Sequence, residues 1–193
     1  MQPSNRFAFK EWAAVCAALE AGRQMLILRK GGIHEGRDGF RVEHREFWLF
    51  PTRFHQATGE LVEDARPLLD QALGDRPPDG LLRLRQYAVV EQVIRIRDER
   101  QLPALEGLHV LSTRTVTERF HYREPGLFVL PVRVYRRCEP LDVPDSPHFA
   151  GCRSWVDLPD ELPTAGLEPV LSEGAFQREL NRIRRALAPT EVA

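Results

Sequence analysis

The sequence has few cysteines, almost no lysine and no long apolar run. The three cysteines, Cys16, Cys138 and Cys152, are widely spaced and form no C-x-x-C pair. Such spacing argues against a disulfide framework and a zinc site, and it is typical of proteins in a reducing cytoplasm. No segment approaches the roughly 20 consecutive apolar residues that cross a bilayer, and the first residues lack the apolar core of a signal peptide. We therefore expect a cytoplasmic protein that does not enter membranes.

Several familiar motifs of catalysis and nucleotide binding are also missing. Neither G-x-x-x-x-G-K nor G-x-G-x-x-G occurs, which excludes the phosphate loops of those two classes. The G-x-S-x-G elbow of a serine hydrolase is absent as well. A restriction-type nuclease core needs an acidic residue two positions before a lysine, but Ala8 precedes Lys10 and Leu28 precedes Lys30 at that offset. These absences favour a binding protein over an enzyme.

Arginine takes the place of the missing lysine. Lysine occurs only at Lys10 and Lys30, so 25 of the 27 basic residues are arginine. Coding bias in a GC-rich genome is a sufficient cause of this preference. Its consequence is that every basic patch presents planar, forked donors that suit phosphate or carboxylate.

The net charge of −1 conceals a division of charge along the chain. Residues 23–56 carry seven basic and four acidic side chains, residues 81–97 four and one, and residues 111–137 six and two. Residues 138–175 carry one basic and eight acidic side chains. The predicted strands are therefore basic, and the segment that follows them is acidic.

Hydrophobic alternation predicts strands at residues 25–29, 41–50, 81–98 and 127–137. The third is long for one strand, so it either bends or splits near Glu91. A helix is predicted near the N-terminus, where four apolar residues recur at helical spacing before a glycine: Phe9, Trp12, Cys16, Leu19 and Gly22. A second helix follows Ser172, with a stripe formed by Phe176, Leu180, Ile183 and Leu187. Residues 109–122 fit either a strand or a helix that begins after Ser112.

Strands outnumber helices, and helices lie at both ends of the chain. This order indicates an α+β fold built on a bent mixed or antiparallel sheet, or on a small β-barrel. The length suits a single domain over residues 1–193. We expect a disordered lead-in at residues 1–6, an irregular acidic segment wrapping the surface at 138–170, and a tail at 189–193.

The most polar stretch between predicted strands is the best place for a site. Residues 25–56 hold Arg29, Lys30, Arg45 and Arg53, which are candidates to contact phosphate. The Gly31-Gly32 pair would let backbone amides approach an anion, although a plain tight turn explains it equally simply. Two strands also place arginine beside tyrosine on the face expected to meet solvent: Arg83, Arg85 and Tyr87 on one, and Arg133, Tyr135 and Arg137 on the other. Arginine with an exposed aromatic ring suits unpaired bases; Trp48 would serve similarly if exposed. The same pattern also fits a solvated sheet face.

An alternative chemistry would use the carboxylates and imidazoles of the same stretch. Glu43, His44, Glu46 and His55 are the candidate catalytic residues of a hydrolase, and His44, Glu46 and His55 are candidate ligands for a divalent metal. Isolated histidines and glutamates on strands more often pair with arginine or the backbone. We therefore expect no cofactor, with a divalent metal as the alternative.

Five segments together resemble a known bacterial family: LRKGGI (28–33), FRVEHREFWLFPTRFHQ (40–56), LPVRVYR (130–136), GCRSWVDL (151–158) and PVLSEGAF (169–176). This family is catalogued as domain of unknown function 1802, and the resemblance covers nearly the whole chain. The strand order and the R-x-Y-R strand also resemble small barrels of the PUA and ASCH type. That second resemblance implies a PUA-like barrel and binding of RNA or modified bases.

Three hypotheses follow from these observations. The first is a cytoplasmic binding domain for RNA, DNA or a nucleotide. The second is a metal-dependent nuclease or other hydrolase. The third is a structural or regulatory partner domain whose acidic segment docks on its own basic sheet. The sequence leaves the oligomeric state open.

Overall fold

The computed structural model describes residues 1–30, 42–53, 58–151 and 153–188. In these ranges the strands are β1 (Ser4–Trp12), β2 (Leu26–Arg29), β3 (Glu46–Thr52), β4 (Leu81–Val90), β5 (Ile94–Ile96), β6 (Leu127–Pro144), β7 (Trp155–Pro163) and β8 (Glu168–Pro169). The α-helices are α1 (Ala13–Glu20), α2 (Arg66–Gly74), α3 (Thr113–His121) and α4 (Glu173–Ala186). Short 3₁₀ turns span Thr58–Glu60, Glu63–Ala65, Glu99–Leu105 and Pro147–Phe149.

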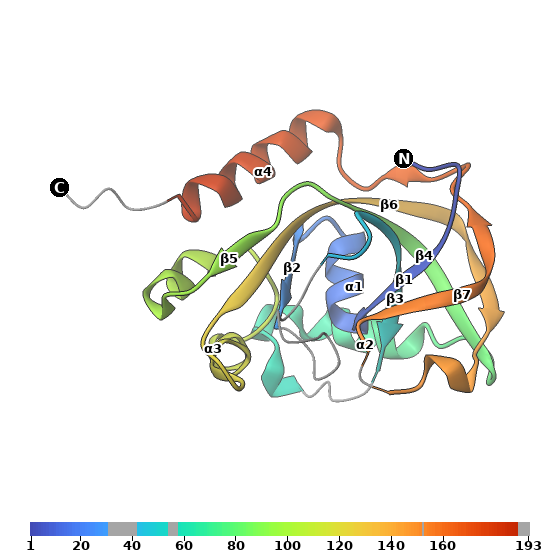
Figure 1. Ribbon diagram of the computed structural model, residues 1–193, viewed down its shortest axis with the longest axis horizontal. Coiled ribbons are helices and arrows are strands. Elements are labelled where there is room, and N and C mark those ends of the chain that lie inside the picture. Colours follow the sequence, from blue (N-terminus) through green and yellow to red (C-terminus); the bar gives the residue numbers. More distant parts are fainter. Residues whose placement is uncertain (31–41, 54–57, 152, 189–193) are drawn as a thin grey trace.

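The described strands form one bent, open sheet of eight strands. Its main path runs β2-β6-β4-β3-β1-β7, with β5 and β8 paired to β6 beside this path. β1 and β3 are parallel, and the other pairs are antiparallel. Figure 1 shows the long β6 arching over α1, with α4 on the outside of the arch. The expected α+β class and bent mixed sheet are confirmed. None of the described helices is both long and apolar enough to cross a bilayer.

The first strand overturns two expectations for the N-terminus. Residues 4–6 belong to β1 and are not a disordered lead-in, and Phe9 and Trp12 lie in that strand and not in a helix. The helix begins only at Ala13. The physical reason is non-local pairing: β1 lies between β3 and β7, and both supply hydrogen bonds that a local spacing rule does not include.

The 81–98 segment was expected either to bend or to split near Glu91, and it splits into two strands. β4 ends at Val90 and β5 begins at Ile94. Within β4, an irregularity between Leu84 and Gln86 shifts the register against β6. Leu84 therefore packs in the same core cluster as Tyr87, three residues later, while Ala88 and Val90 pack in the other cluster. This shift reverses which face each later side chain occupies.

The segment expected to be irregular is largely strand. β6 continues to Pro144, and β7 and the short β8 supply two further strands. The acids of residues 138–175 partly pair with the basic strands, because Asp142 accepts from Arg83 and the carboxylate of Glu173, in α4, pairs with Arg133. The proline-rich composition misled the prediction, since prolines are tolerated where a strand edge or bulge needs no amide donor.

Two apolar clusters lie on the two faces of the sheet. The larger contains α1, α3 and the apolar stripe of α4, and the smaller contains Trp48, Phe50, Leu84 and Phe149. Residues 109–122 resolve as helix α3, whose first turn is capped by Ser112. Ser172 caps α4 in the same way, and the predicted stripe of α4 is buried. The terminal helix was therefore correctly predicted from caps and periodicity.

Candidate ligand-binding site

A hollow of about 60 Å³ lies between helices α1 and α2 and strands β3 and β4. Apolar side chains, with the buried thiol of Cys16 among them, and polar side chains line it together. Burial raises the pKa of Cys16 well above its ordinary value. The lining residues that carry charge or an amide are Glu20, Arg53, Gln71, Asp75, Arg83, Arg85 and Gln86. We call this set the arginine hollow.

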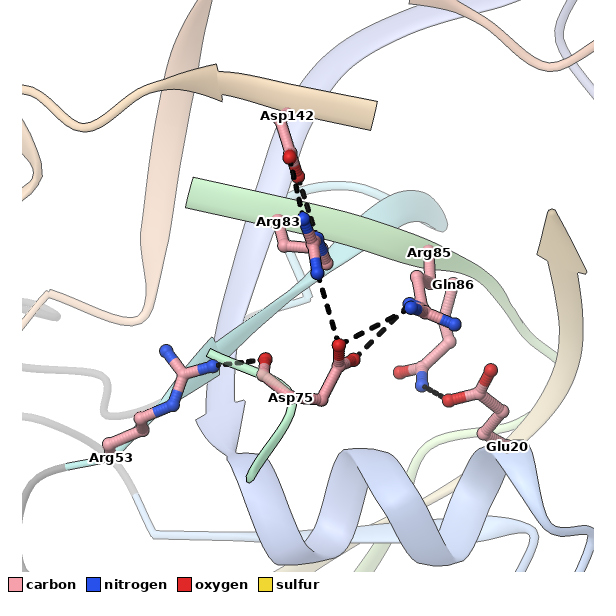
Figure 2. A network of polar contacts seen from close by, with 7 residues as sticks. All are labelled: Glu20, Arg53, Asp75, Arg83, Arg85, Gln86 and Asp142. Atoms are coloured by element: carbon pink, nitrogen blue, oxygen red, sulfur yellow. Dashed lines mark hydrogen bonds and ion pairs between the residues drawn. The ribbon is translucent and has the colours of Figure 1, made fainter. Parts of the chain in front are cut away.

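Arg83 is held on two sides (Figure 2). Its Nε and Nη2 donate to the two carboxylate oxygens of Asp142 at 2.8 and 2.7 Å, and its Nη1 donates to Asp75 Oδ1 at 3.1 Å. The two carboxylates raise the pKa of Arg83. Conversely, the hydrogen bonds from Arg83 lower the pKa of Asp142. This fork-to-carboxylate geometry fixes the plane of the guanidinium group.

Asp75 is the acceptor that all three arginines share. Besides Arg83, its carboxylate faces Arg85, with Nη2 3.3 Å from Oδ1 and Nε 3.3 Å from Oδ2. Arg53, just beyond β3, donates from Nη2 to the Asp75 backbone oxygen at 2.9 Å. Figure 2 shows the three guanidinium groups approaching Asp75 from different directions. Asp75 follows directly after α2, so one helix end organises donors from two strands.

Arg53 differs from the other two arginines. Among the described residues its hydrogen-bond acceptor is a carbonyl oxygen and not a carboxylate, and its Nε, like that of Arg85, is buried without a hydrogen-bond partner. Burial and the neighbouring Arg76 lower the pKa of Arg53. A half-buried guanidinium whose buried Nε lacks a partner is a group that an incoming anion would satisfy.

A hydrogen-bonded amide and carboxylate, those of Gln86 and Glu20, lie at the side of the arginine hollow that faces α1. Gln86 is 6% exposed and donates from Nε2 to Glu20 Oε2 at 2.8 Å. The register shift in β4 turns Gln86 toward α1, where Glu20 ends the helix. The lining thus combines forked cationic donors with a carboxylate and an amide, all in fixed positions.

Lys30 does not reach this hollow. Its ammonium group donates to the backbone oxygens of Phe120 at 3.0 Å and Gly126 at 2.9 Å, and also to that of Glu124. All three donors of the ammonium are used in closing the turn after α3. Burial lowers the pKa of Lys30. The prediction that Lys30 contacts phosphate is therefore wrong in this arrangement.

The remaining candidates of the 25–56 stretch are dispersed. The Nη2 of Arg29 donates to Ser154 Oγ at 2.7 Å, and its guanidinium lies 4.8 Å from the ring centre of Phe9. Glu43 and Arg45 are exposed. Three predicted positions, Gly31, Gly32 and His55, lie outside the described residues.

His44 and Glu46 do not share a face, although strict alternation placed them together. The ring of His44 stacks on Phe7 with centroids 3.4 Å apart and meets the edge of Trp155 at 5.2 Å. Glu46 accepts from the hydroxyl of Tyr87 at 3.0 Å. β3 begins only at Glu46, so alternation does not extend back to His44. Within the described ranges, no three His, Cys, Asp or Glu side chains cluster as metal ligands.

The predicted arginine–tyrosine platform on β4 is wrong. Tyr87 is fully buried, and its hydroxyl accepts from Asn5 Nδ2 at 2.8 Å. Trp48 is also fully buried and meets Tyr87 edge to face at 5.2 Å. The register shift explains this, because it sends Tyr87 to the face opposite Arg83 and Arg85. Neither ring is available for stacking with a ligand.

The second predicted platform, on β6, is occupied by the protein itself. Arg133 pairs with Glu173 and lies 4.9 Å from the ring centre of Phe176 and 5.6 Å from that of Tyr135. Tyr135 packs against the smaller core cluster. Helix α4 thus covers Arg133, and this part of the sheet is an internal contact surface.

Three residues of interest escaped the sequence-based search. Asp75 lies in a turn-rich loop, where an acid is unremarkable, and only the three-dimensional approach of β4 reveals its role. Glu11 is 1% exposed, with Oε2 lacking a hydrogen-bond partner and lying 3.9 Å from Arg29 Nη1. Arg119 covers the ring of Trp12 at 4.3 Å and donates to the oxygen of Leu28. A charged residue inside an apolar run, as Glu11 is, was the available signal.

The fold and the hollow define an α+β domain with an arginine-lined hollow between two helices and two strands. A family model described as Domain of unknown function (DUF1802) matches residues 8–182. The chain belongs to this family. No curated protein matches it.

Among solved structures, the chain is similar to ASCH from Zymomonas mobilis. The identity is 11% over 91% of this chain and 93% of that chain, with a TM-score of 0.45. A mutant form of the same Zymomonas mobilis protein gives 13% identity over 91% and 96% of the two chains, with a TM-score of 0.43.

Proposed function

We propose that this domain binds a phosphate-bearing ligand, either a nucleotide or the backbone of a nucleic acid, in the arginine hollow. The observation that carries the proposal is the convergence of Arg53, Arg83 and Arg85 on one hollow. Planar guanidinium forks suit the oxygens of phosphate, and hydrogen bonds between charged groups are the stronger ones.

Asp75 supports the proposal because it already presents oxygens to these arginines. Its two carboxylate oxygens and its backbone oxygen are spread among three guanidinium groups. A phosphate group also presents several oxygens in different directions, so the donors are arranged in advance for such an anion. Ordering them costs little on binding, since the fold has fixed them already.

Asp75 also opposes the ligand, because its negative charge repels a phosphate. In the proposed mode the ligand takes over contacts with Arg85 and Arg53, while Asp142 continues to hold Arg83. Removing the charge of Asp75 should therefore strengthen binding, whereas removing an arginine should weaken it. These opposite expected effects distinguish binding in the arginine hollow from a general attraction of phosphate to any basic surface.

The test measures binding of a fluorescently labelled 12-nucleotide oligouridylate, and separately of AMP, to the full chain at low and at moderate salt. Arg53→Gln and Arg85→Gln should weaken oligonucleotide binding about tenfold each and reduce its salt dependence. Asp75→Asn should strengthen it. Arg178→Gln, which removes an exposed arginine of α4, is the matched control and should change little.

The proposal is overturned if the wild-type chain binds neither probe at low salt. It is equally overturned if Arg178→Gln weakens binding as much as Arg53→Gln does, since the attraction would then be a property of the whole surface. Weaker binding by Asp75→Asn would contradict the assigned role of Asp75.

A further inference from the structure

The turn after helix α3 presents an exposed aromatic ring on a strained backbone. We call residues 120–126 the Tyr122 turn. Tyr122 is 49% exposed, which is unusual for a large ring in this protein. Arg123, the next residue, has φ = 64° and is the one non-glycine residue with positive φ in the described part of the chain. Such a conformation costs free energy in a residue with a side chain, so its presence at an exposed ring indicates a role.

The protein holds this turn in place from beneath. The three carbonyl oxygens that accept from Lys30 belong to residues 120, 124 and 126, which bracket Tyr122 and Arg123. The amide of Gly126 also donates to the oxygen of Phe120 at 3.0 Å. These hydrogen bonds therefore hold the backbone of the turn in the conformation that gives Arg123 its positive φ. Tyr122 and Arg123 are displayed on a rigid base.

One arginine lies in this turn, and another lies on the strand that pairs with the residues after it. The guanidinium of Arg123 lies 5.4 Å from the ring centre of Tyr122, and that of Arg95, on neighbouring β5, lies 5.4 Å from the ring centre of Phe128. Arg97 follows on the same exposed edge. Three nearby acids have partners, in the pairs Asp98–Arg100, Glu99–His121 and Glu118–Arg114, and the second pair includes the residue before Tyr122. Glu124 is the nearby acid for which the described residues show no such pair.

We propose that the Tyr122 turn binds an unpaired base of single-stranded nucleic acid. The base stacks on Tyr122, and Arg95 and Arg123 contact the phosphates on either side of it. Stacking on an aromatic ring combined with guanidinium contacts is how proteins hold single strands without reading their sequence. A duplex keeps its base faces covered, so an exposed ring selects against it.

This inference rests on the proposed function and narrows its ligand to single strands, while using a surface separate from the arginine hollow. An acidic protein partner would meet the same arginines, but it would gain nothing specific from Tyr122. Binding of a single strand at Tyr122 should therefore depend on the presence of a base. Binding of an acidic protein should depend on charge alone.

The experiment compares two probes with the full-length chain: a 12-nucleotide oligouridylate and an abasic oligomer of the same length and charge. Tyr122→Ala should weaken binding of the oligouridylate about tenfold and leave the abasic oligomer unchanged. Tyr122→Phe keeps the ring and should bind as the wild type does. Arg123→Gln should weaken both probes. Because Tyr122 is exposed, all variants should melt at the wild-type temperature, which checks that they fold.

Each remaining outcome decides the matter. The inference is overturned if Tyr122→Ala binds both probes as the wild type does, or weakens both equally; the arginine hollow would stand if Arg53→Gln still weakened binding. If Tyr122→Ala has its expected effect and Arg53→Gln has none, the inference stands and the proposed function of the hollow fails. Absence of binding to both probes removes both proposals.

Discussion

At the scale of single residues, Lys30 was predicted to contact phosphate, but its ammonium group binds backbone carbonyl oxygens of its own chain. Lys30 satisfies three carbonyl oxygens at the end of α3, where a helix leaves acceptors without partners. A long cationic side chain can substitute for the missing amide donors. Sequence patterns record that Lys30 follows a strand, but they carry no information on which carbonyl groups lie within its reach.

Removing this ammonium group should destabilise the fold. In Lys30→Met, the oxygens of Glu124 and Gly126 lose the ammonium donor, and that of Phe120 keeps only the Gly126 amide. We expect the free energy of unfolding to fall by about 2 kcal/mol. Urea denaturation followed by circular dichroism measures this loss. Arg178→Gln, an exposed substitution, should change the stability by less than about 0.5 kcal/mol. Equal stability of Lys30→Met and the wild type would show that the carbonyls are satisfied without the lysine.

His109 gives the protein a dependence on acid. Burial lowers the pKa of His109 from 6.5 to about 4, and its Nδ1 accepts from the amide of Leu111 at 3.2 Å. Between these two pKa values, the unfolded chain binds a proton that the folded chain does not. The contribution of this residue to stability is therefore complete above pH 6.5 and is lost as the pH falls toward 4, by about 3 kcal/mol.

His109→Asn tests this residue, because asparagine retains an acceptor near the Leu111 amide but does not titrate. Urea denaturation at pH 7, 5.5 and 4 should show the wild type losing more stability than the variant. Parallel curves for the two proteins would mean that His109 titrates in the folded state as it does in the unfolded state.

At the scale of elements, the glycine that ends α1 is needed for its backbone conformation. Gly22 has φ = 65°, and a Cβ placed on it would lie 2.8 Å from Leu171 Cδ2. Gly22→Ala should therefore destabilise the protein by about 1–2 kcal/mol. Gly74, at the end of α2, has open space around it, and Gly74→Ala should be neutral or slightly stabilising. Thermal denaturation of the two variants tests this. A similar effect of Gly22→Ala and Gly74→Ala would contradict the special role of the Gly22 backbone conformation.

Elements defined by local signals could be predicted from the sequence. Ser112 and Ser172 open helices because their side chains accept from amides three residues later, and the stripe of α4 follows from spacing alone. Elements defined by distant partners could not. β1 depends on β3 and β7, and the register shift in β4 depends on its pairing with β6. The shift moved Tyr87 to the opposite face, which removed the predicted platform.

At the scale of the whole molecule, the division of charge has a structural outcome. Acids from the C-terminal third pair with basic strands at Arg83–Asp142 and Arg133–Glu173. The basic sheet is therefore partly neutralised by its own chain. The sequence indicated that arginines would gather on the sheet. Which of them would share a hollow depended on α2 placing Asp75 against β4.

The central claim is that the arginine hollow is a phosphate site. The most direct measurement follows the side-chain Nε–H signals of arginine by NMR while AMP, and then oligouridylate, is added to the full chain. We expect shifts for Arg53, Arg83 and Arg85 that saturate together, and no comparable shift for Arg178. Shifts confined to other arginines, or none at all in the presence of bound ligand, would contradict it.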